Sequence, residues 1–203
     1  CIRDRCNYKH FNTSLIIHNP VEEYSIAQNV LHMLRSDNQF TELEAEVLDL
    51  ILVIHAEHGG GNNSTFTSHV VSSTRTDTYS SISASIGALK GPMHGGANSM
   101  VTKMVEDIKK NTNPYDEVKL KEYLKKIFNK EAFDKKGRIY GMGHAVYTIS
   151  DPRAVLLKKK AYELAKEKNA LEEFELFSNI EKLTKEIGKE TKGKNFEICA
   201  NVD

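Results

Sequence analysis

Apolar residues recur at steps of three and four along most of the chain, and this spacing constrains the fold more than any other feature. It is clearest in residues 41–58, where Thr41 and Glu44 form a capping-box pattern ahead of an apolar face made of Leu43, Val47, Leu50, Ile51 and Ile54. Similar faces predict helices in 22–35, 100–108, 118–128, 155–168 and 170–190. Residues 193–203 suggest a loop or short extended piece, and no run of strands is indicated, so we expect an all-α fold.

Residues 65–90 are unusually rich in Ser, Thr and Ala. Such a composition fits either a helix with small, closely packed side chains or a chain of turns, because Ser and Thr hydroxyls also bond to nearby backbone groups. Of the two we favour one helix over this segment. No repeat of 20 to 50 residues accompanies it, which argues against a solenoid.

Composition and charge narrow the class of partner. The chain has 203 residues, of which 39% are hydrophobic, enough to bury a core as one large domain or two small ones. Its 28 basic and 28 acidic residues cancel, so no basic field indicates nucleic acid or an anionic membrane, and we expect a small-molecule partner. No apolar run reaches the roughly 18 residues of a membrane span, and the polar start is unlike a signal peptide.

Three cysteines, Cys1, Cys6 and Cys199, are an odd number without metal-ligand spacing. We expect free thiols in a reducing compartment.

A glycine-rich segment, GPMHGGAN at 91–98, surrounds His94 just before a helical pattern. The positive end of a helix dipole disfavours a cationic imidazole, so a neutral ring there can donate one hydrogen bond to a carbonyl oxygen. An alternative of equal weight is a turn histidine that caps a backbone group. The first interpretation makes His94 an electrophile.

A second glycine-bearing loop, GMGHAVYTISDPRA at 141–154, places His144 nine residues before Arg153. Asp151 and Pro152 form an N-cap and first-turn pair, so Arg153 is expected in the first turn of a helix. A histidine and an arginine on one short segment offer a proton donor and a clamp for a carboxylate. With this second loop, we favour a catalytic role for both His94 and His144 over the interpretation of His94 as a turn histidine.

The segment HAEHGGGN at 55–62 carries His55 and His58, three residues apart with a carboxylate between them. This spacing permits a metal site, but three successive glycines favour close approach of the backbone to a small polar substrate. His55 continues the apolar helical face, so it is also readable as a buried, hydrogen-bonded histidine.

These segments, HAEHGGGNNSTFTSHV, GPMHGGAN, GMGHAVYTISDPRA and the closing NVD, resemble in order and spacing the signature segments of citrate synthase. The resemblance implies an all-helical, homodimeric enzyme with a large and a small domain. It implies condensation of acetyl-CoA with oxaloacetate and hydrolysis of the citryl thioester. It implies no metal or organic cofactor, since acetyl-CoA is a substrate.

The resemblance also assigns roles residue by residue. His94 matches the donor to the thioester carbonyl oxygen, Asp203 the base that takes the methyl proton, and His144 the residue that polarises the ketone of oxaloacetate. Oxaloacetate would further contact His58, Asn62 and Arg153. Residues expected beside the coenzyme A arm are Gly141, Met142, Gly143, Ala145 and Asn201.

By the same resemblance, residues 1–96 form part of the large domain, and residues 97–203 form most of the small domain, ending at the catalytic Asp203. The chain is then the middle of a longer enzyme and is expected to be inactive alone, because further arginines of the family have no counterpart. Two alternatives stay open: 2-methylcitrate synthase, which uses propionyl-CoA, and a noncatalytic helical module. The expected location is the bacterial cytoplasm, or the mitochondrial matrix for a eukaryotic source.

Overall fold

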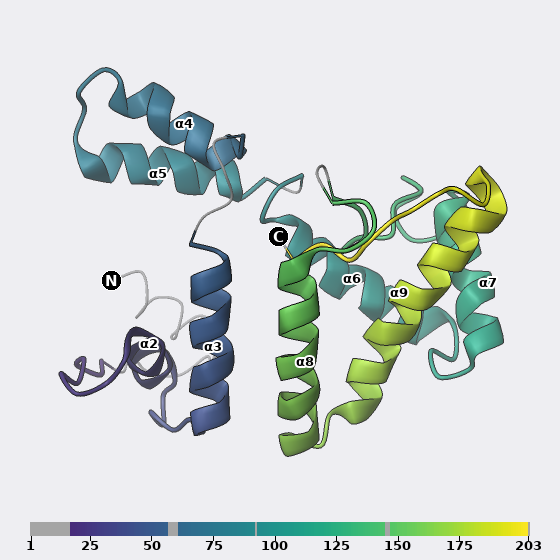
Figure 1. Cartoon of the computed structure of the whole chain (residues 1–203), viewed down its shortest axis with the longest axis horizontal. Helices are drawn as coiled ribbons and strands as arrows, with labels where there is room; N and C mark the ends of the chain where they lie inside the picture. The colour runs from purple at the N-terminus through teal and green to yellow at the C-terminus, as the bar shows by residue number, and fades with distance from the viewer. Residues whose placement is uncertain (1–16, 57–60, 92, 145–146, 203) are drawn as a thin grey trace.

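The computed structural model describes residues 17–56, 61–91, 93–144 and 147–202 (Figure 1). Within these ranges the chain forms helices joined by loops, with no strand beyond one isolated antiparallel bridge between Met142 and Ala200. The all-α prediction is confirmed. The helices are α2 (Ile26–Leu34), α3 (Glu42–Ile54), α4 (Asn63–Ser72), α5 (Thr78–Leu89), α6 (Ala97–Asn111), α7 (Glu117–Phe128), α8 (Pro152–Glu167) and α9 (Leu171–Lys192).

Side-chain caps fix where several of these helices begin. The predicted capping box of α3 is present, because Thr41 Oγ accepts from the Glu44 backbone N–H at 3.2 Å and Glu44 accepts from Thr41 N–H at 2.7 Å. Asp151 caps α8 and Pro152 opens it, as the sequence predicts. The start of α8 positions Arg153, so this cap also bears on the candidate site.

The prediction of one helix over 65–90 is wrong, because α4 and α5 are separate helices joined by a turn. Ser73 and Thr74 hydroxyls bond back to backbone carbonyls at 2.7 and 2.9 Å, and Arg75 adopts a positive φ of 60°. Asp77 then accepts from the Ser80 backbone N–H at 2.9 Å and starts α5. Local hydroxyl and carboxylate bonds thus end one helix and begin the next, which is the competition that this composition allows.

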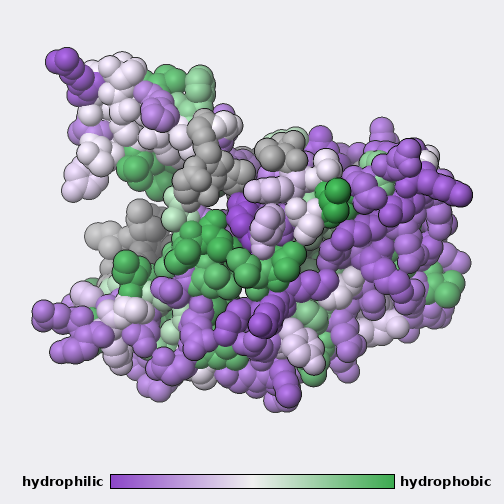
Figure 2. Space-filling view, viewed as in Figure 1, coloured by the Kyte–Doolittle hydropathy of each residue, from purple (hydrophilic) through white to green (hydrophobic). Residues whose placement is uncertain are grey.

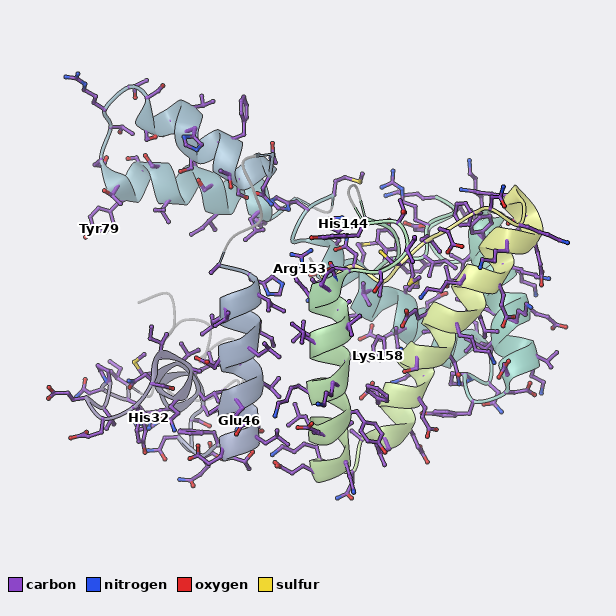
Figure 3. The ribbon with its side chains drawn as sticks, viewed as in Figure 1. His32, Glu46, Tyr79, His144, Arg153 and Lys158 are labelled. Atoms are coloured by element: carbon purple, nitrogen blue, oxygen red, sulfur yellow. The ribbon has the colours of Figure 1, made fainter. Side chains whose placement is uncertain are left out.

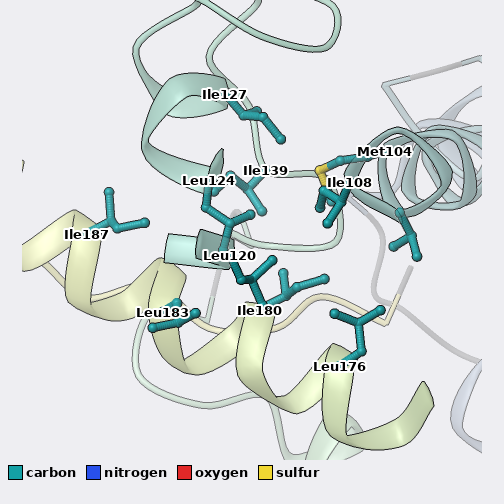
Figure 4. Close-up of a cluster of buried hydrophobic side chains, with 11 residues drawn as sticks. Met104, Ile108, Leu120, Leu124, Ile127, Ile139, Leu176, Ile180, Leu183 and Ile187 are labelled. Atoms are coloured by element: carbon teal, nitrogen blue, oxygen red, sulfur yellow. The ribbon is translucent and has the colours of Figure 1, made fainter. Parts of the chain in front are cut away.

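The hydrophobic core lies where α6, α7 and α9 meet (Figure 4). All but one of its side chains come from these three helices, and it consists of Met104, Val105, Ile108, Leu120, Leu124, Ile127, Ile139, Leu176, Ile180, Leu183 and Ile187. Ile139 belongs to the loop between α7 and α8, and Tyr140 and Met142 pack against the same cluster. The core therefore anchors the glycine-bearing loop that carries the candidate site residues.

Helix α8 packs against α9 on one side and α3 on the other, while α2 packs against α3 (Figure 1). Polar contacts join the C-terminal end of α8 to the start of α3: Thr41 Oγ donates to Glu167 at 2.8 Å, and Lys168 pairs with Glu44 at 3.0 Å. The two helices are antiparallel, so the N-terminus of α8 lies at the same end as the C-terminus of α3.

Helices α4 and α5 pack chiefly against each other and stand apart from the other helices in Figure 1. No helix among the described residues is long and apolar enough to cross a membrane. The division into a large domain of residues 1–96 and a small domain of residues 97–203 stays a prediction.

Candidate active site

The GPMHGGAN segment forms a tight turn between α5 and α6. The Gly96 backbone N–H donates to the carbonyl oxygens of Leu89 and Gly91, both at 3.1 Å, and the His94 N–H donates to Gly91 at 3.0 Å. A Cβ on Gly96 would meet the Gly91 carbonyl oxygen at 2.7 Å, so only glycine fits this close approach. The turn therefore places His94 two residues before the N-cap of α6.

The imidazole of His94 contacts the hydroxyl of Ser64, which was not among the predicted site residues. Ser64 Oγ, in the first turn of α4, lies 2.8 Å from His94 Nε2. Asn62 caps the same helix by accepting from the Ser64 backbone N–H at 2.9 Å. The ring thus bonds a side chain rather than capping a backbone group, and among the described residues Nδ1 has no hydrogen-bond partner.

N–H groups approach both ring nitrogens of His144, the other histidine of the predicted pair. The Tyr147 backbone N–H donates to His144 Nδ1 at 3.1 Å, and the two rings lie 4.9 Å apart. Because Nδ1 accepts, the proton of a neutral ring is on Nε2. A guanidinium nitrogen of Arg153, also a donor, lies 3.3 Å from that Nε2. The His144 ring and the Arg153 guanidinium therefore meet at one place.

Arg153 is held there by Asp151. Its NH2 and Nε donate to Asp151 Oδ2 at 2.8 and 3.2 Å, and the Asp151 side chain is fully buried whereas that of Arg153 is 15% exposed. Burial raises the pKa of Asp151, but the hydrogen bonds and charge of Arg153 outweigh burial and hold this pKa below its usual range. Arg153 and His144 lie together at the N-terminal end of α8 (Figure 3).

The glycine-bearing loop and the C-terminal segment run side by side. Asn201 donates its backbone N–H to the Gly141 carbonyl and its side-chain amide to the Gly143 carbonyl, both at 2.9 Å. Gly143 has a φ of +96°, a conformation that favours glycine. Four of the five residues predicted to border coenzyme A are thus brought together with the Met142–Ala200 bridge, while Ala145 lies outside the described residues.

A hollow of about 750 Å³ adjoins this pair of segments. Its mostly apolar lining includes Asn98 and Val101 of α6, Met142, Ala154 of α8 and Asn201. His94, His144 and Arg153 do not line this hollow, which lies beside these polar side chains. Its size and lining suit a small organic group rather than a macromolecule.

His55 links the end of α3 to the C-terminal segment. Its Nδ1 lies 2.8 Å from the Ile51 carbonyl oxygen, and its Nε2 lies 3.3 Å from that of Val202. The ring is hydrogen-bonded as predicted, but the residue is exposed, so the prediction of a buried histidine is wrong. It ends the helix instead of continuing its inner face.

His58 and Asp203 lie outside the described residues, and so do Cys1 and Cys6. Among the residues that the structure does describe, no group of three or more His, Cys, Asp or Glu side chains could hold a metal ion. Cys199 is a free, buried thiol that donates to the Tyr147 carbonyl at 3.2 Å. Burial, and then the charge of Asp151, raises the pKa of this thiol.

The structure therefore forms two polar clusters from the predicted residues: His94 with Ser64, and His144 with Arg153. No hydrogen bond joins the two clusters within the described ranges. Ser64, 30 residues from His94 in the sequence, was not among the predicted site residues, and Asp151 was predicted only as a helix cap. The DPR tripeptide contained the signal for Asp151, since an N-cap carboxylate and an arginine two residues later can meet.

Curated relatives are citrate synthases and close variants. Citrate synthase of Haloferax volcanii is 37% identical over 185 residues, which are 91% of this chain and 43% of that protein. Citrate synthase 2 of Bacillus subtilis is 42% identical over 71% of this chain and 36% of its own length. A 2-methylcitrate synthase of Corynebacterium glutamicum is 39% identical over 72% of this chain and 36% of its own length.

The solved structures that resemble this chain include citrate synthases as well. Citrate synthase from Thermotoga maritima superposes with a TM-score of 0.72 at 29% identity, covering 99% of this chain and 49% of that one. The Thermoplasma acidophilum enzyme, solved in a ternary complex with carboxymethyl coenzyme A and oxaloacetate, gives 0.68 at 28% identity, with 98% and 48% covered. The chain thus spans less than half the length of these proteins. A family model described as the C-terminal domain of citrate synthase matches residues 6–203, and the chain therefore belongs to the citrate synthase family.

Proposed function

We propose that the protein containing this chain condenses acetyl-CoA with oxaloacetate and hydrolyses the resulting citryl thioester. The observation that carries the proposal is the contact at 3.3 Å between His144 Nε2 and Arg153 NH2. Because Nδ1 of His144 accepts from Tyr147, Nε2 of the neutral ring is the nitrogen that can donate, as the Arg153 guanidinium also can. A 2-oxo dicarboxylate supplies two adjacent acceptors, its ketone oxygen for the histidine and a carboxylate for the arginine.

His94 would act on the other substrate. When the Ser64 hydroxyl donates to Nε2, the neutral ring carries its proton on Nδ1 and can donate it to the thioester oxygen. A preorganised donor at a developing oxyanion contributes about 3 to 4 kcal/mol to lowering the barrier. In this proposal Asp203 takes a proton from the methyl carbon, so that an enolate forms against His94.

The remaining steps follow from the same groups. The enolate carbon attacks the ketone carbon, a C–C bond forms, and His144 gives its Nε2 proton to the new alkoxide. Water then cleaves the C–S bond and releases coenzyme A and citrate. Only acid–base side chains take part, so the proposal includes no metal or organic cofactor, and acetyl-CoA enters as a substrate.

The coenzyme A arm would lie along the hollow beside Gly141, Met142, Gly143 and Asn201. The apolar lining fits a flexible chain of methylene and amide groups, and the glycines keep the loop thin. The Thermoplasma acidophilum citrate synthase, whose structure holds a coenzyme A analogue and oxaloacetate, has the same fold over nearly all of this chain.

A second copy of the chain is the proposed partner, through the α4–α5 hairpin. Its helices leave large apolar side chains exposed: Tyr79 is 85% exposed, Phe66 63%, Ile86 56% and Ile82 51%. Figure 2 shows hydrophobic residues on this hairpin. Two such hairpins facing each other would bury these side chains in an isologous interface. A cytoplasmic location stays a prediction.

2-Methylcitrate synthase remains the second candidate, because one of the relatives carries that name at 39% identity. The two activities differ in a single methylene of the acyl group, and the polar clusters described above do not distinguish them. The acyl donor must therefore be identified by assay.

The test is thiol release by the natural full-length protein with oxaloacetate and either acetyl-CoA or propionyl-CoA. We expect release that requires oxaloacetate and is faster with acetyl-CoA. Faster turnover of propionyl-CoA would transfer the assignment to 2-methylcitrate synthase, and no release with either donor would contradict the proposal.

Two variants separate the roles of the clusters. His94→Gly should slow thiol release by about 10² to 10³ with oxaloacetate affinity nearly unchanged. Arg153→Leu should instead weaken oxaloacetate binding by about 10²-fold or more, because a carboxylate would lose its charged partner. Unchanged turnover in the first variant, or unchanged affinity in the second, would remove that residue from the mechanism.

A further inference from the structure

Asp151 is the most completely buried charged side chain at the candidate site, and neither the sequence resemblance nor the proposed mechanism gives it a role. Its side chain has no exposed surface, yet it lies two residues from Arg153, which contacts His144. An isolated carboxylate in such a place is costly unless a cation compensates it. The arrangement of its hydrogen bonds shows how that compensation is used.

Each carboxylate oxygen of Asp151 makes two contacts with Arg153. Oδ1 accepts from the backbone N–H at 2.9 Å and from Nε at 3.2 Å, whereas Oδ2 accepts from NH2 at 2.8 Å and from Nε at 3.2 Å. One carboxylate therefore accepts hydrogen bonds from both the backbone and the guanidinium of the same arginine. Three of these contacts hold the planar guanidinium in its observed orientation, which leaves NH2 next to His144 Nε2.

We infer that Asp151 is a positioning residue for oxaloacetate recognition: its buried carboxylate sets which edge of the Arg153 guanidinium faces His144. This inference rests on the proposed function. Asp151 would not touch the substrate; it would act through Arg153.

Helix capping alone does not require this arrangement, as a second N-cap aspartate shows. Asp116 caps α7 by accepting from the Val118 and Lys119 backbone N–H groups at 3.1 and 3.2 Å, and its side chain is 36% exposed. An asparagine caps a helix about as well as an aspartate. A neutral amide at position 151 could therefore keep the cap, but it could not hold the guanidinium by charge.

The experiment compares Asp151→Asn with Asp116→Asn in the natural full-length protein. Oxaloacetate affinity is measured by titration calorimetry, and the KM for acetyl-CoA is measured separately by thiol release. We expect Asp151→Asn to weaken oxaloacetate binding about tenfold to a hundredfold, with the KM for acetyl-CoA within about twofold of the wild type. Asp116→Asn, the matched cap control, should leave both values unchanged. Unchanged or tighter oxaloacetate binding in Asp151→Asn would overturn the inference.

A double-mutant cycle tests whether Asp151 acts through the fork of the arginine. Lysine at position 153 keeps the charge that compensates Asp151 but lacks the planar fork. In the Arg153→Lys background, Asp151→Asn should change oxaloacetate affinity by less than about threefold. A full tenfold effect in that background would mean that Asp151 acts independently of the guanidinium, and the inference would fail.

Two further measurements keep the result interpretable. If Asp151→Asn does not fold, as judged by circular dichroism, Asp151→Glu replaces it: the charge is retained but moved by one methylene, so oxaloacetate binding should still weaken. Wild-type affinity in that variant overturns the inference. Failure of the proposed function appears differently, because the wild-type protein would then not bind oxaloacetate at all.

Discussion

The α4–α5 hairpin and the α6–α7–α9 cluster are built from the same kind of element but are stabilised in different ways. In the cluster, Leu120, Leu124 and Leu183 are completely buried. In the hairpin, α4 buries no residue and α5 buries only Ser81. Side-chain caps occur in both regions: Asn62 and Asp77 cap the two hairpin helices, and Asp116 caps α7 in the cluster. Caps thus decide where helices begin, whereas burial of apolar side chains decides which region holds itself together.

This difference has a consequence for assembly. Hydroxyl bonds such as Ser85 to the Ser81 carbonyl, at 2.9 Å, satisfy polar groups within α5 but bring little net stability. The apolar side chains of the hairpin can contribute only when another surface covers them. We therefore expect substitutions in the cluster to affect folding and substitutions in the hairpin to affect association.

The largest effect is expected for a truncation in the cluster. Leu124→Ala removes a completely buried side chain and should lower the free energy of unfolding by about 2 to 5 kcal/mol. Ile82→Ala, on the exposed face of α5, is the matched control and should cost less than about 1 kcal/mol at concentrations below self-association. Urea denaturation followed by circular dichroism measures both. Equal losses would show that the hairpin supports the fold as much as the cluster does.

The next effect concerns the hairpin surface. Ile86→Asp places a charge on an apolar face that is exposed in the single chain. Self-association should therefore become less favourable by about 2 kcal/mol or more. Val118→Asp, at a 68% exposed apolar position on α7, is the control and should leave association unchanged. Sedimentation velocity over a range of concentrations gives both values. An unchanged dimer in Ile86→Asp would exclude this face as the interface.

The sequence predicts the buried face of α9 in the cluster, but it does not predict the break between the two hairpin helices. The periodicity of residues 170–190 predicted one apolar face made of Phe174, Phe177, Ile180, Leu183 and Ile187. The last three are buried in the core, whereas Phe177 is 43% exposed. The break between α4 and α5 was missed, because Ser- and Thr-rich segments satisfy helix and turn alike and the choice depends on bonds such as Ser73 to Val70. Periodicity carries no information where side chains are small and polar.

Of the two polar clusters at the candidate site, one was predicted from the sequence and the other was not. His144 and Arg153 were predicted as partners because only nine residues separate them, and the structure brings them within 3.3 Å. Ser64 and His94 could not be paired from the sequence, since a turn of unknown geometry lies between α4 and α5. Local spacing thus identified one cluster, and only the fold revealed the other.

A smaller effect is expected where charge, rather than apolar contact, holds two helices. Arg35 bonds both oxygens of Glu44 at 2.8 Å, and this pair, aided by the Thr41 backbone N–H and Lys168, lowers the pKa of Glu44 to about 2. Because the folded pKa lies below the unfolded value, the stabilisation is present above about pH 4.5 and is lost as pH falls towards 2. We expect it to be about 1 to 3 kcal/mol.

Glu44→Gln tests this pH dependence. The variant should be less stable than the wild type at pH 7, and the difference should shrink as the pH is lowered from about 4.5, because the wild type then loses the same charge. Urea midpoints measured from pH 7 to pH 3 provide the comparison. A difference that stays constant over this range would mean that packing around Glu44, not its charge, stabilises the α2–α3 junction.

The smallest effect is expected for the ion pair at the rim of the cluster between α6 and α9. Lys109 Nζ lies 2.8 Å from Glu173 Oε1, but the two side chains are 40% and 54% exposed, so solvent screens the pair. Lys109→Met keeps most of the apolar stem and removes the charge, and the free energy of unfolding should change by less than about 0.5 kcal/mol. Glu173→Gln is a second variant that removes the pair from the other side. A loss above about 1.5 kcal/mol in both variants would mean that the exposed rim, and not the buried leucines and isoleucines, stabilises the contact between α6 and α9.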